Sequence, residues 1–180
     1  MADSPKRRLI LLRHAKSAWP DVADQDRPLA GRGRRAAPAA GRWLRESGHV
    51  PDLVLCSTAL RARETWQLAQ EELGAHPQTT FERRVYGASA AELLELAREA
   101  PSGVRRLMIV GHEPTMSDLT LELADDDRGA ALDRVRAKFP TAAIAILVFT
   151  GSWPELGPGK ARLAEFVVPG DLGSRRGADS

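Results

Sequence analysis

The sequence predicts a single α/β domain, a three-layer α/β/α sandwich with a mostly parallel central sheet. Three short apolar segments carry this prediction, because each is strand-sized and ends in charged or turn-forming residues: 9–12, 52–56 and 106–110. Segments with helical spacing separate them, and this alternation is typical of a parallel sheet covered by helices. Because no repeat or linker divides residues 1–180, we expect one domain, with a core at about 8–168 and a disordered polar tail at 169–180.

The first strand and helix occupy the N-terminal quarter of the chain. Leu9–Leu12 is predicted as a buried strand, and the polar segment Ala18–Pro28 is expected to run over the surface near its end. Helical spacing follows in Leu29–Ser47, where Pro38 fits poorly because an interior proline costs a helix about 3 kcal/mol. The helix therefore either begins close to Pro38 or is kinked there, and Gly48 is expected to end it.

A second strand and helix follow. Asp52–Cys56 is predicted as a buried strand, and Ser57 and Thr58 are expected to cap the next helix. Apolar residues at helical spacing extend that helix from Leu60 to Leu73, and Thr79–Phe81 is predicted as a short edge strand.

The remaining elements complete the sandwich. Ser89 is expected to cap a helix at Ala90–Glu99, with Glu92 completing a capping box. We then expect a strand, a helix, an irregular stretch and a closing hairpin of two strands, at Arg106–Val110, Thr115–Leu123, Asp125–Pro140, Ala142–Phe149 and Ala161–Val168. Trp153, in the turn of this hairpin, is expected to be exposed.

The composition excludes several classes of function. The 26 basic residues are offset by 24 acidic ones, and a net charge of +2 does not predict nucleic-acid binding. The apolar segments are too short to span a membrane or to form a secretory signal. Cys56 is the one cysteine, so no internal disulfide is expected. The histidines, of which His49 and His76 are expected at the surface, lack clustered acidic residues and predict no metal site. We expect a cytoplasmic protein without cofactors.

Basic residues follow the predicted strands at the points where the strands end. Arg13 and His14 follow the first strand, Arg61 lies just beyond the second, and His112 follows the third. Because the carboxyl ends of parallel strands lie at one edge of a sheet, we expect these residues to converge. Guanidinium groups bind phosphoryl oxygens bidentately, and a neutral imidazole can attack phosphorus while a second stabilises the transferring oxygens. The sequence therefore predicts a phosphoryl pocket.

These strand-end motifs resemble those of the histidine phosphatase superfamily, which includes the phosphoglycerate mutases. The motifs are Leu12-Arg13-His14-Ala15, Ser57-Thr58-Ala59-Leu60-Arg61 and Gly111-His112. Within the superfamily, Arg27-Pro28-Leu29 followed by Gly31 and Gly33 is similar to SixA-like phosphohistidine phosphatases. The resemblance runs from about Arg8 to Leu123, and it implies a phosphoglycerate mutase-like fold.

The resemblance also implies roles for individual residues. His14 matches the nucleophile that becomes phosphorylated. The other members of the phosphate pocket are matched by Arg13, Arg61 and His112. Ser17 matches a position whose side chain approaches the phosphate in relatives. At the mouth of the pocket, Lys16 and Arg27 are candidates for binding a phosphorylated partner, with ordinary surface charge as the alternative for both.

One part of the superfamily's machinery is missing or displaced. Many members carry a glutamate that protonates the leaving oxygen, and the comparable stretch here, residues 84–89, contains no carboxylate. SixA-like proteins resemble this chain in lacking it. Glu113 is one alternative source of the proton and solvent is the other, while a helix N-terminal carboxylate is the competing interpretation of Glu113. Because imidazole leaves more easily than an alkoxide, the absence favours phosphohistidine and aryl phosphates as substrates.

We therefore expect a metal-independent phosphatase that acts through phosphorylated His14, with phosphohistidine on a protein as its substrate. Two alternatives remain open: a phosphatase that acts on a small phosphorylated metabolite, and a non-enzymatic domain that binds phosphorylated partners.

Overall fold

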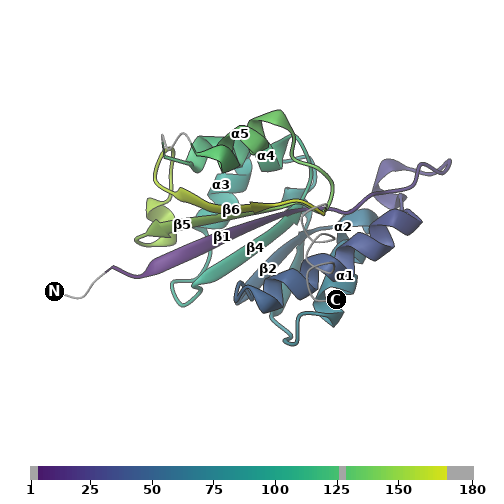
Figure 1. Cartoon of the computed structure of the whole chain (residues 1–180), viewed down its shortest axis with the longest axis horizontal. Helices are drawn as coiled ribbons and strands as arrows, with labels where there is room; N and C mark the ends of the chain where they lie inside the picture. Colours follow the sequence, from purple (N-terminus) through teal and green to yellow (C-terminus); the bar gives the residue numbers. More distant parts are fainter. Residues whose placement is uncertain (1–3, 126–128, 170–180) are drawn as a thin grey trace, which may run out of the picture.

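The central sheet and its flanking helices are defined by a computed structural model that describes residues 4–125 and 129–169. Helices cover both faces of the sheet, as Figure 1 shows. The predicted fold class, an α/β/α sandwich with a mostly parallel sheet, is confirmed. Apart from Pro169, the predicted tail lies outside the described residues, as do residues 126–128 of the predicted irregular stretch.

The sheet has the strand order β3-β2-β4-β1-β5-β6. Its strands are β1 (Lys6–Arg13), β2 (Leu53–Ser57), β3 (Gln78–Glu82), β4 (Arg106–Gly111), β5 (Ile144–Thr150) and β6 (Arg162–Val167). β1, β2, β3 and β4 pair in parallel, whereas β5 pairs antiparallel with both β1 and β6. The parallel pairing brings the carboxyl ends of β1, β2 and β4 to one edge.

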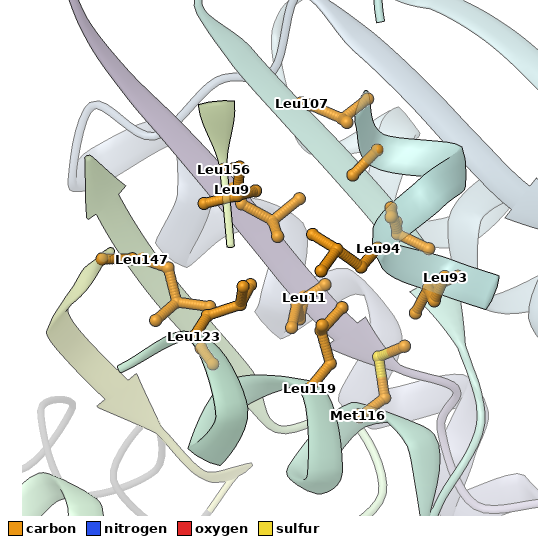
Figure 2. Close-up of a cluster of buried hydrophobic side chains, with 14 of the residues drawn as sticks. Leu9, Leu11, Leu93, Leu94, Leu107, Met116, Leu119, Leu123, Leu147 and Leu156 are labelled. Carbon is orange, nitrogen blue, oxygen red and sulfur yellow. The ribbon is translucent and has the colours of Figure 1, made fainter. Parts of the chain in front are cut away.

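The helices are α1 (Gly31–Glu46), α2 (Leu60–Glu71), α3 (Ala90–Arg98), α4 (Thr115–Leu123) and α5 (Ala130–Ala137). Alternate residues of β1 point to opposite faces of the sheet. Leu9 and Leu11 belong to the core under α3 and α4, which Figure 2 shows, and Ile10 and Leu12 belong to the core under α1 and α2. Burial on both faces explains why this strand is a continuous apolar run.

Pro38 lies inside α1, so of the two alternatives given for this proline, the one in which the helix begins close to it is wrong. Pro38 cannot donate the hydrogen bond that a regular helix would direct to Arg34. Close packing of α1 on α2 compensates, because a Cβ at Gly41 would lie 2.0 Å from the carbonyl oxygen of Ala69. Packing of the buried face of α1 therefore allows the helix to continue through the proline, against its local propensity.

Three further expectations about individual segments are wrong. Trp153 is buried, since a 3₁₀ turn, η3 (Trp153–Glu155), folds it onto the core and its indole donates to Val104 O at 2.8 Å. His49 is also buried, with Nε2 2.6 Å from Glu165 Oε2 and its ring stacked on Trp43. The stretch predicted as irregular contains α5, whose short apolar face gives a weak helical signal.

In the described part of the chain, no helix has the length and apolar character that crossing a membrane requires.

Candidate active site

His14 stands immediately beyond β1, and its backbone and ring are both held in place. Its N–H donates to Gly111 O at 3.0 Å, and the next N–H, that of Ala15, donates to Thr65 Oγ1 at 2.9 Å. The ring Nδ1 lies 2.7 Å from Ala15 O. Because a carbonyl oxygen can only accept, Nδ1 carries the proton and Nε2 carries the lone pair. A neutral His14 ring therefore carries its lone pair on Nε2, the form in which an imidazole can act as a nucleophile.

The environment of His14 keeps its ring neutral. Burial first, and then the charges of His112, Arg61 and Arg13, lower the pKa of His14 from 6.5 to about 3, against the opposing effect of the Ala15 carbonyl. A protonated imidazole has no lone pair on Nε2 and cannot attack phosphorus. At neutral pH the side chain is thus in the form that nucleophilic catalysis requires.

His112 follows β4 and lies beside His14, with the two ring centroids 5.3 Å apart. Its Nε2 is 2.7 Å from Ser57 Oγ, at the carboxyl end of β2. Burial first, and then the charge of Arg61, lower the pKa of His112 to about 4. Its Nδ1, like Nε of Arg13, is buried without a hydrogen-bond partner among the described residues, so the protein itself leaves both of these polar atoms unpaired.

The contact with His112 also explains why the predicted helix cap is wrong. The N-cap of α2 is Ala59, which makes no side-chain cap bond. Ser57 Oγ instead accepts from Ala59 N at 3.2 Å and contacts the His112 ring. Ser57 is therefore part of the site, where it orients an imidazole.

The two arginines lie close enough to both histidines to lower their pKa values. Arg61, in the first turn of α2, is buried, and its charge lowers the pKa of both His14 and His112. Arg13 has the same effect on both rings, and its Nη1 donates to Phe139 O at 2.8 Å. Burial lowers the pKa of Arg13, which the charge of Glu113 partly opposes. The structure thus brings together all four residues predicted to form the phosphate pocket.

Ser17 and Arg27 lie together at the base of the segment 18–28, which we call the strap. It extends past the carboxyl edge of the sheet (Figure 1). Arg27 Nη2 donates to Ser17 Oγ at 2.6 Å, and Arg27 Nε donates to Ala18 O at 3.1 Å. The guanidinium also lies 3.3 Å from the ring centroid of Trp19. Both Ser17 and Arg27 are buried, so they anchor the strap, and Arg27 is not free surface charge.

Lys16 is exposed, but its backbone is fixed against α1. A Cβ at Gly33 would lie 2.2 Å from Lys16 O, and Ala30 N donates to the same oxygen at 2.8 Å. Only glycine allows the helix to approach the chain this closely. Close packing of α1 at Gly33 therefore fixes the backbone of the segment that follows His14.

Besides Ser57, two residues of the site were not predicted from the sequence, Asp24 and Tyr86. Asp24 lies in the 3₁₀ turn η1 (Asp24–Asp26) of the strap, and its carboxylate accepts from Arg61 Nη2 at 3.1 Å. The hydroxyl of Tyr86 donates to the same carboxylate at 2.6 Å, and its ring meets the His112 ring edge-on with centroids 5.6 Å apart. The strap holds three aspartates, and their spacing does not show which one turns inward.

Both carboxylate oxygens of Glu113 accept hydrogen bonds at the start of α4. Its Oε1 accepts from Ser117 N at 2.6 Å and its Oε2 accepts from Ser117 Oγ at 2.8 Å. These bonds support the interpretation of Glu113 as a helix N-terminal carboxylate. The structure thus favours a local, stabilising role for this residue.

The free energy of unfolding is expected to fall as the pH falls from about 6.5 towards 4. The folded-state pKa values of His14, about 3, and His112, about 4, lie below the usual 6.5, so the unfolded chain binds more protons in this range. Each histidine adds a slope of at most about 1.4 kcal/mol per pH unit, and the effect vanishes above about pH 7. Urea unfolding at several pH values measures it. His14→Asn should flatten the dependence, and an unchanged slope would contradict the assignment.

Known proteins of one superfamily are similar to this chain in sequence and in structure. The sequence model of the histidine phosphatase superfamily (branch 1) matches residues 9–85. An uncharacterized protein of Mycobacterium tuberculosis is 45% identical over 161 residues, covering 88% of this chain and 99% of that protein. The solved structure of SixA from Nakamurella multipartitia is 34% identical, with a TM-score of 0.82 and coverage of 93% of this chain and 99% of that one. SixA from Agrobacterium tumefaciens is 33% identical, with a TM-score of 0.74 and coverage of 92% and 99%. The chain belongs to the histidine phosphatase superfamily.

Proposed function

We propose that the protein is a phosphatase that transfers a phosphoryl group to Nε2 of His14 and then to water, with phosphohistidine on a protein as its substrate. The observation that carries the proposal is a neutral, oriented His14 beside His112 and two arginines. Similarity to the two SixA proteins, which are candidate phosphohistidine phosphatases, supports the substrate class. The free thiol of the buried Cys56 suits the reducing cytoplasm as the place of action.

In the first step, Nε2 of His14 attacks phosphorus, and the bond from phosphorus to the substrate nitrogen breaks with its electron pair. The departing imidazole takes a proton from solvent. Arg13 and Arg61 bind the phosphoryl oxygens, and Nδ1 of His112 donates to one of them as their charge develops. Ser57 keeps the His112 ring in the orientation that this bond needs.

In the second step, water attacks the phosphorus of phosphorylated His14. The bond from phosphorus to Nε2 breaks, and its electron pair returns to the imidazole. The proton of the attacking water leaves to solvent or to the product phosphate. Neither step requires a metal ion.

The carboxylates near the site are unsuited to act as a general acid, and this supports a substrate with a good leaving group. Residues 84–89 contain no carboxylate, and Glu113 is bonded to Ser117. The hydroxyl of Tyr86, followed by the guanidinium groups of Arg27 and Arg61, holds the pKa of Asp24 well below its usual range, so Asp24 has no proton to give. Without a general acid, worth about 10²–10⁴-fold in rate, expulsion of an alkoxide is slow, whereas imidazole and phenolate leave readily.

The test is a turnover comparison on the full chain in the presence of EDTA. The substrates are a phosphohistidine peptide, the phosphoserine peptide of the same sequence, an aryl phosphate and a sugar phosphate. We expect kcat/KM for phosphohistidine to exceed that for phosphoserine by at least about 10²-fold, with no loss in EDTA. A preference for the sugar phosphate would contradict the substrate class, and no turnover of any substrate would indicate a binding domain.

A further inference from the structure

In the described structure, the guanidinium of Arg61 is already occupied by an anion that the chain itself supplies, the carboxylate of Asp24. Arg61 Nη2 donates to Asp24 Oδ2 at 3.1 Å, and Arg61 Nη1 donates to the carbonyl oxygen of Asp24 at 2.7 Å. Both terminal nitrogens of the guanidinium are thus engaged by one residue of the strap. These are the nitrogens with which an arginine binds a phosphoryl group bidentately.

Two further donors complete the set around Asp24. The Tyr86 hydroxyl donates to Oδ2 at 2.6 Å, and Arg27 Nη1 donates to Oδ1 at 3.1 Å. Two guanidinium groups and a hydroxyl that converge on one anion provide the chemistry that recognises a phosphoryl group. The carboxylate therefore resembles a phosphoryl group in its charge and in its partners.

The position of Asp24 allows a substrate to displace it. Its side chain is 49% exposed, whereas that of Arg61 is 8% exposed. An ion pair with one half-exposed partner is weak, and a phosphoryl group offers more charge and three oxygens. The strap keeps its own anchors when the carboxylate leaves, because the bonds from Arg27 to Ser17 and Ala18 do not involve Asp24.

We propose that Asp24 is an internal competitor of the phosphoryl group: its carboxylate occupies Nη2 of Arg61 in the resting enzyme, and substrate or inorganic phosphate must displace it from that nitrogen. The inference rests on the proposed function, because it takes Arg61 as the receiver of the phosphoryl group. Displacement also frees the Tyr86 hydroxyl to donate to a phosphoryl oxygen. The return of Asp24 after hydrolysis expels product phosphate, so the enzyme is only weakly inhibited by it.

Isothermal titration with inorganic phosphate tests this role, using Asp24→Asn, which removes the charge and keeps the shape. We expect the variant to bind phosphate about tenfold more tightly than the wild type, because the competing state no longer reduces the binding-competent fraction. The matched control is Asp26→Asn. Asp26 is an exposed residue of the same 3₁₀ turn, and its substitution removes the same charge. The control is expected to bind phosphate within about twofold of the wild type, since solvent screens this charge.

Unchanged or weaker phosphate binding by Asp24→Asn would overturn the proposal, and weaker binding would make Asp24 a positioning residue for Arg61. Equal tightening in both variants would also overturn it, because net charge alone would then explain the effect. A second measurement uses the wild type: the ¹³C resonance of the Asp24 carboxyl should shift during titration with inorganic phosphate, and a static resonance would contradict displacement. Turnover of an aryl phosphate is measured separately, so failure of the proposed function is distinguishable from failure of this inference.

Discussion

Replacement of His14 by alanine is expected to lower kcat by at least about 10⁴-fold while leaving the fold intact. The substitution removes Nε2, the atom that forms the bond to phosphorus, and none of the neighbouring groups replaces it. His112 is held by Ser57, and the arginines are charged and not nucleophilic. Steady-state turnover of an aryl phosphate measures the loss, and thermal unfolding checks the fold.

The matched control is His76→Ala. His76 is exposed and lies in the loop between α2 and β3, so the substitution removes an imidazole without touching the pocket. This control should retain wild-type turnover. Residual activity of His14→Ala near the wild-type level would show that another group attacks phosphorus.

Arg61→Ala is expected to lower kcat/KM by about 10³-fold. Arg61 is buried and acts electrostatically on both histidines. Its two terminal nitrogens, which donate to Asp24 in this structure, are the donors that we propose for the phosphoryl group. Arg61→Lys should restore little of the loss, because an ammonium group cannot reproduce the planar bidentate contact. Kinetics with an aryl phosphate across both variants measure the two effects.

Arg63→Ala provides the comparison for this prediction. Arg63 lies two residues further along α2, is exposed and donates to Thr58 O at 3.0 Å. Its removal changes the net charge by the same amount and should leave kcat/KM within about twofold of the wild type, because exposed charges act weakly. Similar losses in Arg61→Ala and Arg63→Ala would indicate that general positive charge, and not the pocket, binds the substrate.

The convergence of the pocket could be predicted from the sequence because topology enforces it. β1, β2 and β4 are apolar on both faces, which predicts parallel buried strands, and parallel strands end at one edge. His14 and His112 follow two of these strands directly. Their proximity, with ring centroids 5.3 Å apart, therefore follows from the order of elements and needs no knowledge of loop conformation.

The parts that the sequence did not predict depend on loop conformation and on packing between distant segments. Asp24 reaches Arg61 and Tyr86 from a strap whose ends are held together, by the bonds from Arg27 to Ser17 and Ala18 and by the backbone bridge between Ser17 and Leu29. Ser57 has the position of a helix cap, and only the tertiary contact with His112 assigns it to the site. Local patterns carry no signal for such contacts.

The central claim is that catalysis passes through phosphate bound to His14. Its most direct test is to mix the wild-type chain with an aryl phosphate or a phosphohistidine peptide, to quench within milliseconds in alkaline denaturant, and to locate phosphate by mass spectrometry. The alkaline quench preserves the acid-labile bond from phosphorus to nitrogen. We predict a phosphorylated peptide that contains His14, formed at a rate no slower than turnover and absent from His14→Ala. Phosphate on a different residue, or turnover without any phosphorylated peptide, would contradict it.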